Sequence, residues 1–237
     1  MALPQLTWMF VNVLNAEANM MRATWTPPSP SEVLAIVRDA RLRLVGNARE
    51  LVDVVIESLE RLQDTDLKGQ TPRAQFLWNE SADGMLRPKS EPQISDYVKA
   101  FLEEDLSRRG IIVNREVEVR GPEGSGKTDI HIDAVSKGKG QFERLKPVVE
   151  IKGCWHQELQ SALKDQLVDQ YLSTADCRDG VFLVAWFDTE SWDTDDYRKN
   201  RVPKWTVEKA REFFRGEAME NSDSNRLVRG FVLDCSF

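Results

Sequence analysis

The stretch Val148-Val149-Glu150-Ile151-Lys152-Gly153 decides the fold of this 237-residue chain. Apolar and charged residues alternate in it, and on a β-strand successive side chains point to opposite faces of the sheet. Val149 and Ile151 should therefore share one face, while Glu150 and Lys152 lie side by side on the other. The stretch predicts a strand that has an apolar face and a charged face.

Upstream, residues 128–133 alternate in the same way. Ile130 and Ile132 share one face of this predicted strand, and Asp129, His131 and Asp133 share the other. If the two strands pair, their charged faces combine. Such a combination is more typical of a site for a hard divalent metal ion than of a packed sheet interior.

The segments around these strands predict an α/β fold with a mixed central sheet flanked by helices. A helix should begin at Ser90, which forms a capping box with Gln93. Strands should follow over residues 111–120, 128–135 and 147–152, then a helix over 156–172 and a buried strand over 181–187. A short helix over 207–214 and a strand over 227–233 should end the domain, and residues 69–89 and 136–145 are expected to form loops.

Residues 1–68 are predicted to form a helical N-terminal extension, and residues 69–237 the sheet domain. Helices are expected over 3–21, 29–44 and 47–62, the last with a capping box of Asn47 and Glu50. Their amphipathic stripes are typical of a scaffold that packs on the following domain. A docking surface for a partner is the alternative.

Composition restricts the function classes. The formal net charge of −7 argues against a protein that coats nucleic acid nonspecifically, but it is compatible with an enzyme that has a local basic groove. With only two histidines, His131 and His156, a histidine-rich zinc site is not expected. Three cysteines without CxxC spacing indicate reduced thiols in the cytoplasm, and no apolar run is long enough to span a membrane.

The glycine-rich segment 121–128 matches the phosphate-loop pattern GxxxxGK[ST] and includes Lys127. In that motif a helix must follow the lysine, so that its first amides face the phosphates. Here the alternating residues that follow predict a strand. We therefore expect a turn between two strands, and a nucleotide-binding protein that uses Lys127 is the less favoured alternative.

Asp129 followed by Glu150-Ile151-Lys152 resembles the PD-(D/E)xK nuclease superfamily, which has the restriction-endonuclease-like fold. The resemblance covers about residues 90–187 and includes the order helix, three strands, helix, strand. It implies that Asp129, Glu150 and the backbone carbonyl of Ile151 bind Mg²⁺ or Mn²⁺. It also implies that Lys152 positions or activates the attacking water.

The resemblance suggests further site residues on the two core helices. Glu91, at the start of the first core helix, corresponds to a glutamate that completes the metal site in some branches. Gln166 and Tyr171 correspond to a glutamine and a tyrosine one helical turn apart on the second, although here they are five residues apart rather than four. Thr128 also replaces the proline of the motif.

The chemistry of these residues supports the same interpretation. Phosphodiester cleavage needs a cation that neutralises the phosphate and generates a nucleophilic water, and a nearby lysine can stabilise the developing charge. The alternative for Glu150 and Lys152 is an ion pair on a solvated strand face. His131 and Asp133 are expected to support the metal ligands or to have a structural role.

Several other residues could contact a nucleic acid. Trp155 and His156 could line the substrate path or pack in the core, and Trp192 and Trp205 could stack on bases or lie in the core. A local excess of basic residues could follow a phosphate backbone or form a solvated face. It consists of Arg198, Lys199, Arg201, Lys204, Lys209, Arg211 and Arg215.

Together these patterns predict a cytoplasmic, Mg²⁺- or Mn²⁺-dependent nuclease. DNA is the favoured substrate, which makes it a DNA endonuclease, and RNA is the second candidate. The resemblance suggests an effector in host defence or repair, as a homo-oligomer or within a larger assembly. The alternatives are a non-catalytic nucleic-acid or protein-interaction domain with this fold, and the phosphate-loop protein.

Overall fold

The computed structural model describes most of the chain after residue 44 and short pieces before it. The described residues are 9, 12–16, 19–20, 29–31, 45–80, 82–107, 111–121, 124–138, 141–173 and 177–236. Contacts divide the chain into two compact units, Met1–Arg43 and Leu44–Phe237, and every element named below belongs to the second. The helices expected over 3–21 and 29–44 lie outside the described residues, apart from those pieces.

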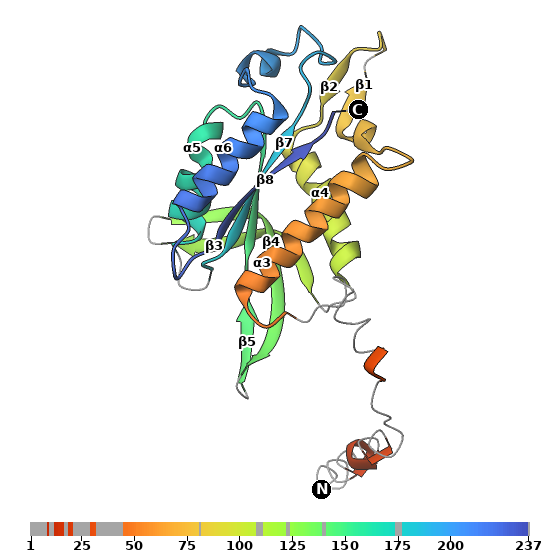
Figure 1. Cartoon of the computed structure of the whole chain (residues 1–237), viewed down its shortest axis with the longest axis vertical. Helices are drawn as coiled ribbons and strands as arrows, with labels where there is room; N and C mark the ends of the chain where they lie inside the picture. The colour runs from red at the N-terminus through yellow and green to blue at the C-terminus, as the bar shows by residue number, and fades with distance from the viewer. Residues whose placement is uncertain are drawn as a thin grey trace, which may run out of the picture. The chain divides into compact units, whose positions relative to one another are not determined.

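A mixed sheet of six strands forms the centre of the second unit (Figure 1). The strands follow the order β3-β4-β6-β7-β8, and β5 pairs with β4. Their bounds are β3 Ile112–Gly121, β4 Gly124–Gly138, β5 Gln141–Leu145, β6 Val148–Gly153, β7 Gly180–Trp186 and β8 Val228–Asp234. β4 is antiparallel to β3, β5 and β6, whereas β6, β7 and β8 are parallel. The predicted α/β class with a mixed sheet is confirmed.

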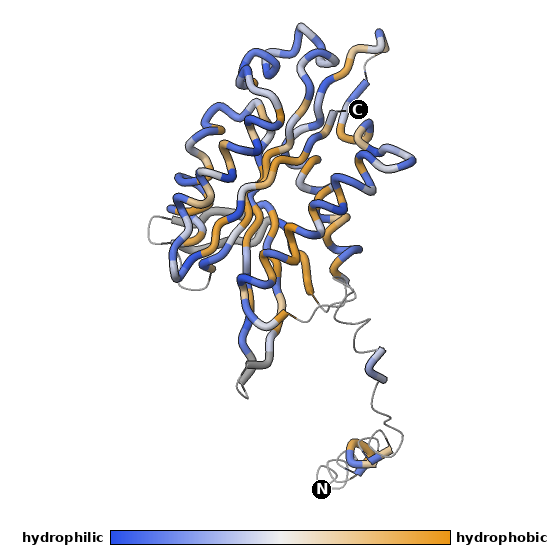
Figure 2. The backbone as a smooth tube through the Cα atoms, in the orientation of Figure 1, coloured by the Kyte–Doolittle hydropathy of each residue, from blue (hydrophilic) through white to orange (hydrophobic). Residues whose placement is uncertain are grey.

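Helices cover both faces of this sheet (Figure 1). On one face lie α3 Ala48–Arg61 and α4 Glu91–Leu106, and on the other lie α5 Leu159–Ala162, the π-helix η5 Leu163–Tyr171 and α6 Val207–Glu220. Hydrophobic residues are concentrated along the central strands and on the helix sides that face them (Figure 2). Cys154, Cys177 and Cys235 are all free and buried in this core.

The capping box predicted for α4 is present. The backbone N–H of Ser90 donates to Oε1 of Gln93 over 3.1 Å, which fixes the first turn of the helix. The apolar residues at helical spacing are fully buried: Ile94, Val98, Leu102 and Leu106. The N-terminus of α4 is thus held in place by local sequence, which matters because Glu91 stands there.

α3 belongs to one of the helical layers that cover the sheet. Its N-cap is Asn47, as predicted, and the Asn47 side chain accepts the N–H of Glu50 over 3.0 Å. The return bond of the predicted capping box is shifted by one residue, because Glu50 accepts the N–H of Gly46 over 2.7 Å. The helix contacts α4, β7 and β8, and Arg61 and Ser58 both donate to Asp105 of α4. This helix, which we assigned to the extension 1–68, therefore packs on the sheet. Contacts place the boundary between the two units of the chain between Arg43 and Leu44.

Two segments expected to be loops contain strands. Residues 136–145 include β5, which pairs with the far end of β4 from Ala134↔Leu145 to Gly138↔Gln141. Residues 69–89 include the 3₁₀ helix η3 Ala74–Leu77 and a hairpin of β1 Trp78–Glu80 and β2 Leu86–Pro88. Both predictions were wrong because these strands are short or strongly polar, so they show no alternation that would reveal them.

Element boundaries also differ from the sequence expectation. The helix expected over 156–172 begins at Leu159 and continues from Leu163 as a π-helix. α6 continues to Glu220, beyond the expected end at residue 214. Among the described residues, no helix is both long and apolar enough to cross a membrane.

The packing of α6 on β8 can be tested at Gly230. A Cβ atom at this position would lie 2.2 Å from the carbonyl oxygen of Phe214 in α6. We expect Gly230→Ala to lower the free energy of unfolding by about 1–3 kcal/mol, as overpacking does. Urea unfolding followed by circular dichroism measures this change.

Gly216→Ala, on α6, is the matched control. A Cβ atom there would meet nothing within 4 Å. Alanine favours a helix interior over glycine by about 0.5–1 kcal/mol, so this variant should be slightly more stable than the wild type. Equal stabilities of the two variants would contradict the described packing.

Candidate functional site

The site is built where β4 and β6 separate. Their pairing ends at Ile130↔Val149. One residue further along, the carboxylate of Asp129 accepts the N–H of Ile151 over 2.9 Å, in the place where a backbone carbonyl would continue the ladder. Asp129 also lies near Glu150, because its charge raises the pKa of that carboxyl group.

Pairing also determines the face on which Glu150 and Lys152 lie. Val149 pairs with Ile130 and shares its face, so Glu150 and Lys152 point to the opposite face. Phe182 pairs with Glu150, and its ring lies 5.6 Å from that of Phe214 in α6. Glu150 and Lys152 therefore lie on the sheet face that η5 and α6 cover.

This covering buries the charged pair. Glu150 is 2% exposed and Lys152 is 9% exposed, so they do not form a solvated surface pair. Nζ of Lys152 lies 2.8 Å from Oε1 of Glu150. Oε2 of Glu150 is buried and has no hydrogen-bond partner among the described residues. Such an atom requires an explanation, because buried polar atoms are nearly always bonded.

The electrostatics of the pair follow from this burial. Burial, and then the charge of Asp129, raise the pKa of Glu150 to about 7, although Lys152 opposes them. Burial would lower the pKa of Lys152, but the nearby carboxylates of Glu150, Glu91 and Asp129 outweigh it and raise that pKa. Near neutral pH the lysine is charged, and the glutamate is close to its titration point.

Asp129 is held from several sides. Burial raises the pKa of its carboxyl group, and the hydrogen bond from Ile151 opposes this shift. The hydroxyl of Ser95 in α4 lies 3.4 Å from Oδ1. The sequence analysis missed Ser95, although its position one turn after Glu91 on α4 could have indicated it.

Tyr171 reaches the same site from η5. The residue is buried, and its pKa is raised by burial and then by the charges of Glu150 and Asp129. Gln166 is half-buried on the same helix. Hydrogen bonds in a π-helix join residues i and i+5, so two residues five apart lie above one another there, as residues four apart do in an α-helix. The five-residue spacing of Gln166 and Tyr171 thus suits η5.

Glu91 lies at the edge of the site. Its Oε1 accepts the N–H of Gly153 over 3.0 Å, which ties the start of α4 to the end of β6. Its charge also raises the pKa of Lys152. The structure therefore brings Asp129, Glu150 and Lys152 together, with Glu91 on the lysine side.

The donor atoms fit a hard cation. Oε2 of Glu150 lacks a partner among the described residues, and the carboxylate of Asp129 is near enough for its charge to raise the pKa of Glu150. The carbonyl of Ile151 points to the same strand edge as its N–H, toward Asp129. All three are oxygen donors, which Mg²⁺ prefers. In the described part of the chain, however, no three Asp, Glu, His or Cys side chains are arranged to hold a metal ion.

His131 and Asp133 form a separate cluster. Nε2 of His131 lies 3.7 Å from Asp133, whose carboxylate also binds Arg144 over 3.2 Å. Burial lowers the pKa of His131. Within the described residues, its Nδ1 is buried without a partner. Asp133 thus joins His131 and Arg144 beside the site.

Lys127 and Thr128 belong to β4, which already begins at Gly124. β3 and β4 remain paired up to Gly121↔Gly124. Lys127 thus lies in a strand, as the alternation predicted, in place of the helix that a phosphate loop needs. The turn expected over the glycine-rich segment was wrong for Gly121 and Gly124–Gly126, which already belong to the paired strands.

The aromatic residues near the site belong mainly to the core. Trp192 is 2% exposed and packs against Trp155, Phe187 and Trp78. Trp205 is half-buried against Phe213. The core alternative thus holds for Trp192.

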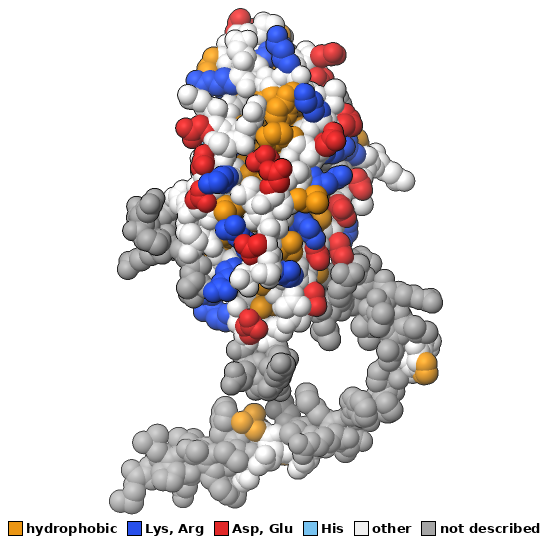
Figure 3. Space-filling view, turned by 60° about the vertical axis from the view of Figure 1, so that its left-hand side comes forward, with side chains coloured by type: hydrophobic (Ala, Val, Ile, Leu, Met, Phe, Trp, Pro, Cys, Tyr) orange, Lys and Arg blue, Asp and Glu red, His pale blue; other side chains and the backbone are white. Residues whose placement is uncertain are grey.

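The basic residues 198–215 do not form one surface. Arg211 and Arg215 line a hollow with Glu60 and Asp64 near β8, whereas Arg201 lines a different groove. On the face that Figure 3 shows, Lys and Arg side chains are interspersed with Asp and Glu. A long phosphate backbone would meet no continuous basic track on that face.

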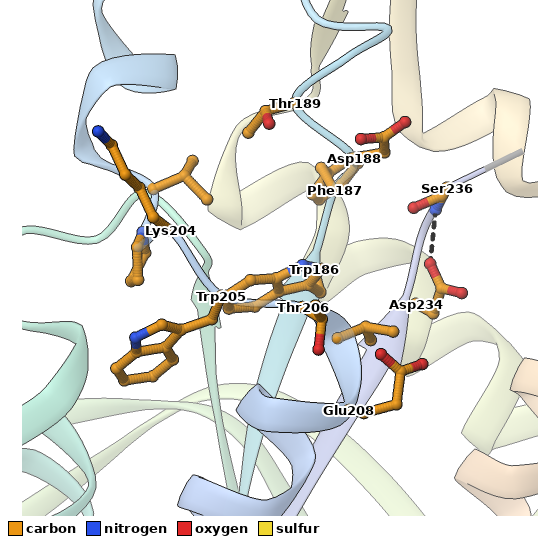
Figure 4. A pocket seen from close by; sticks show the side chains of 13 residues that line it. Trp186, Phe187, Asp188, Thr189, Lys204, Trp205, Thr206, Glu208, Asp234 and Ser236 are labelled. Atoms are coloured by element: carbon orange, nitrogen blue, oxygen red, sulfur yellow. Dashed lines mark hydrogen bonds between the residues drawn. The ribbon is translucent and has the colours of Figure 1, made fainter.

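A separate hollow lies beyond the carboxyl ends of β7 and β8 (Figure 4). Its lining includes Asp188, Glu208 and Asp234, and the last accepts the N–H of Ser236 over 3.0 Å. Lys204 and Trp205, two of the residues predicted to contact a nucleic acid, also line it, whereas none of the predicted metal-site residues does.

Part of the chain is similar to a known family of domains. A family model described as a domain of unknown function, DUF8371, matches residues 68–189. No curated protein and no solved structure matches the chain. The matched residues extend from just before η3 to just after β7 and include Glu91, Asp129, Glu150 and Lys152.

The raised pKa of Glu150 predicts a pH-dependent stability. Between the ordinary glutamate pKa and about 7, the folded state keeps a proton that the unfolded state has lost. Stability should therefore fall as pH rises through this window. Glu150→Gln mimics the protonated form, so in metal-free buffer it should gain up to about 3 kcal/mol over the wild type between pH 5 and 8.

Urea unfolding at several pH values measures this difference. Glu103→Gln is the control, because Glu103 lies on the exposed side of α4 in an ion pair with Lys99. Its stability difference from the wild type should stay nearly constant over the same range. A constant difference for Glu150→Gln as well would contradict the described environment of Glu150.

Proposed function

The chain belongs to DUF8371, a family of domains of unknown function, and from its site we propose that it is a divalent-metal-dependent nuclease that hydrolyses phosphodiester bonds in DNA. The observation that carries this proposal is the buried, unpartnered Oε2 of Glu150 beside Asp129 and Lys152. Burying a carboxylate oxygen without a partner is costly, and a bound cation would remove that cost.

Glu150, Asp129 and the carbonyl of Ile151 would hold Mg²⁺ or Mn²⁺. When bound, the ion supplies neutralisation of the phosphate and a lowered pKa of water. The hydrogen bond from Ile151 to Asp129 holds that carboxylate at the edge of β6, beside the residue that follows Glu150 in sequence. The residues thus offer a preorganised set of oxygen donors on two strands of a rigid sheet.

Lys152 would stabilise the charge that develops on the phosphate. Its raised pKa keeps it protonated, and burial strengthens its electrostatic interactions. Glu91 would fix the end of β6 beside it through Gly153. Tyr171 lies close enough to Asp129 and Glu150 for their charges to raise its pKa. In this proposal it would help to position these two carboxylates.

A second candidate function is a non-catalytic nucleic-acid or protein-interaction domain. It is favoured by one observation: the described residues contain no group of three metal-ligating side chains. In that case Lys152 would simply neutralise Glu150 in the core. The unpartnered Oε2 of Glu150 has no role in this alternative, which is why we favour the nuclease.

The wider setting is also proposed. The resemblance to PD-(D/E)xK nucleases supports DNA, or else RNA, as substrate and a role as an effector of host defence or repair, as a homo-oligomer or in a larger assembly. Three free, buried cysteines support a cytoplasmic location, where thiols stay reduced.

A cleavage assay tests the proposed function. Purified protein should cut plasmid or single-stranded DNA in the presence of Mg²⁺ or Mn²⁺ and lose this activity with a chelator. Glu150→Ala and Lys152→Ala should each lower the rate by about 100-fold or more, because the first removes a ligand of the metal ion and the second removes the charge that stabilises the reacting phosphate. Gel electrophoresis of labelled DNA measures the rates.

Lys127→Ala and Glu103→Gln are the controls, and both should cut at the wild-type rate. Cleavage that survives Glu150→Ala would contradict the site. ATP hydrolysis that depends on Lys127 would instead support the phosphate-loop alternative.

A further inference from the structure

A groove adjoins the site on the side of Glu91. It lies between the N-terminus of α4 and the segment that follows β7, and its lining includes Glu91, Trp155, His156, Tyr197 and Arg201. Glu91 also binds Gly153, the residue after Lys152. The groove, called the Tyr197 groove below, is therefore continuous with the edge of the proposed active site.

Tyr197 presents an exposed ring in this groove. The relative exposure of Tyr197 is 66%, whereas nearby aromatic residues such as Trp155 and Trp192 are buried. It begins the 3₁₀ helix η6 Tyr197–Arg201, and the guanidinium carbon of Arg201 lies 5.0 Å from the centre of its ring. Proteins that bind single-stranded nucleic acid use an exposed aromatic ring, on which a base stacks, beside a cation that binds a phosphate.

The support under Tyr197 is rigid. Asp196 caps η6 by accepting the N–H of Arg198 over 3.0 Å. The guanidinium of Arg198 lies 4.8 Å from the ring of Trp155 and donates to the carbonyl of Pro88 over 2.9 Å. The exposed ring is thus held on a core-anchored turn, so stacking on it costs little ordering entropy.

The charges in η6 differ in their availability. Arg198 is paired with Asp196, and Nζ of Lys199 donates to the carbonyl of Trp192 over 2.6 Å. In contrast, no acidic residue in the described part of the chain forms an ion pair with Arg201, which is exposed. Arg201 is therefore the cation of this turn that remains available for a phosphate.

We propose that the Tyr197 groove binds a single-stranded segment of nucleic acid, with a base stacked on Tyr197 and a phosphate bound by Arg201. Only an unpaired base exposes its face to such a ring, so continuous duplex is excluded from this contact. This inference rests on the proposed nuclease function, because the groove would then lead a single strand or a frayed end to Glu150 and Lys152.

Fluorescence anisotropy with a labelled single-stranded oligonucleotide tests this inference in a chelator, so that nothing is cut. Tyr197→Ala should weaken binding about 10-fold or more, and Tyr197→Phe should restore it, because stacking needs only the ring. Arg201→Ala should also weaken binding and should reduce the dependence of log K on log salt by about 0.7, as expected for one lost phosphate contact. Duplex of equal length should bind weakly to all of them.

Arg215→Ala is the matched control, because Arg215 is an exposed arginine on α6 that lines a different hollow. It should bind single strands like the wild type. No single-strand binding by the wild type, or unchanged binding by Tyr197→Ala, would overturn the inference.

A second readout separates this inference from the nuclease itself. Hydrolysis of bis(p-nitrophenyl) phosphate with Mn²⁺ needs no groove, so Tyr197→Ala should retain the wild-type rate and Glu150→Ala should lose it. If nothing is hydrolysed but Tyr197→Ala still weakens single-strand binding, the groove stands and the nuclease proposal fails. If hydrolysis persists and Tyr197→Ala binds normally, the groove fails and the nuclease stands.

Discussion

The separation of β4 from β6 is the constraint on which the rest of the site depends. A regular ladder would continue past Ile130↔Val149 with backbone hydrogen bonds, but the carboxylate of Asp129 takes the N–H of Ile151 instead. This side-chain bond satisfies a buried backbone donor and fixes an acidic group at the opening. It also leaves the carbonyl of Ile151 facing the same opening. One interaction thus opens the sheet and orients two oxygen donors.

The helices that cover the sheet determine the burial, and therefore the pKa values, of the charged residues at the opening. η5 and α6 bury Glu150 and Lys152, so the pKa of Glu150 rises to about 7 and its Oε2 has no partner among the described residues. α4 reaches the site from its N-terminus, where Glu91 binds Gly153 and also lines the Tyr197 groove. The capped start of α4 therefore connects the charged pair to the surface on which a substrate strand would lie.

Much of this architecture could be predicted from the sequence. Alternation in residues 148–153 indicated β6 and its charged face, and the capping box located α4 together with Glu91. β5 and the β1–β2 hairpin could not be predicted, because such short strands show no alternation of apolar and polar residues. They are held in place by pairing with a neighbouring strand. The π-helical turn at η5 depends on tertiary packing, which local patterns do not encode. For Ser95, the helical spacing from Glu91 was the only local signal, and its contact with Asp129 joins distant parts of the sequence.

The central claim is that Glu150 and Asp129 together hold a divalent cation. Crystals soaked in Mn²⁺ and measured at the manganese absorption edge test it most directly. The account predicts an anomalous peak about 2.0–2.3 Å from Oε2 of Glu150 and from the carboxylate of Asp129, near the carbonyl of Ile151. A map without a peak between these two carboxylates, at Mn²⁺ concentrations of several millimolar, would contradict it.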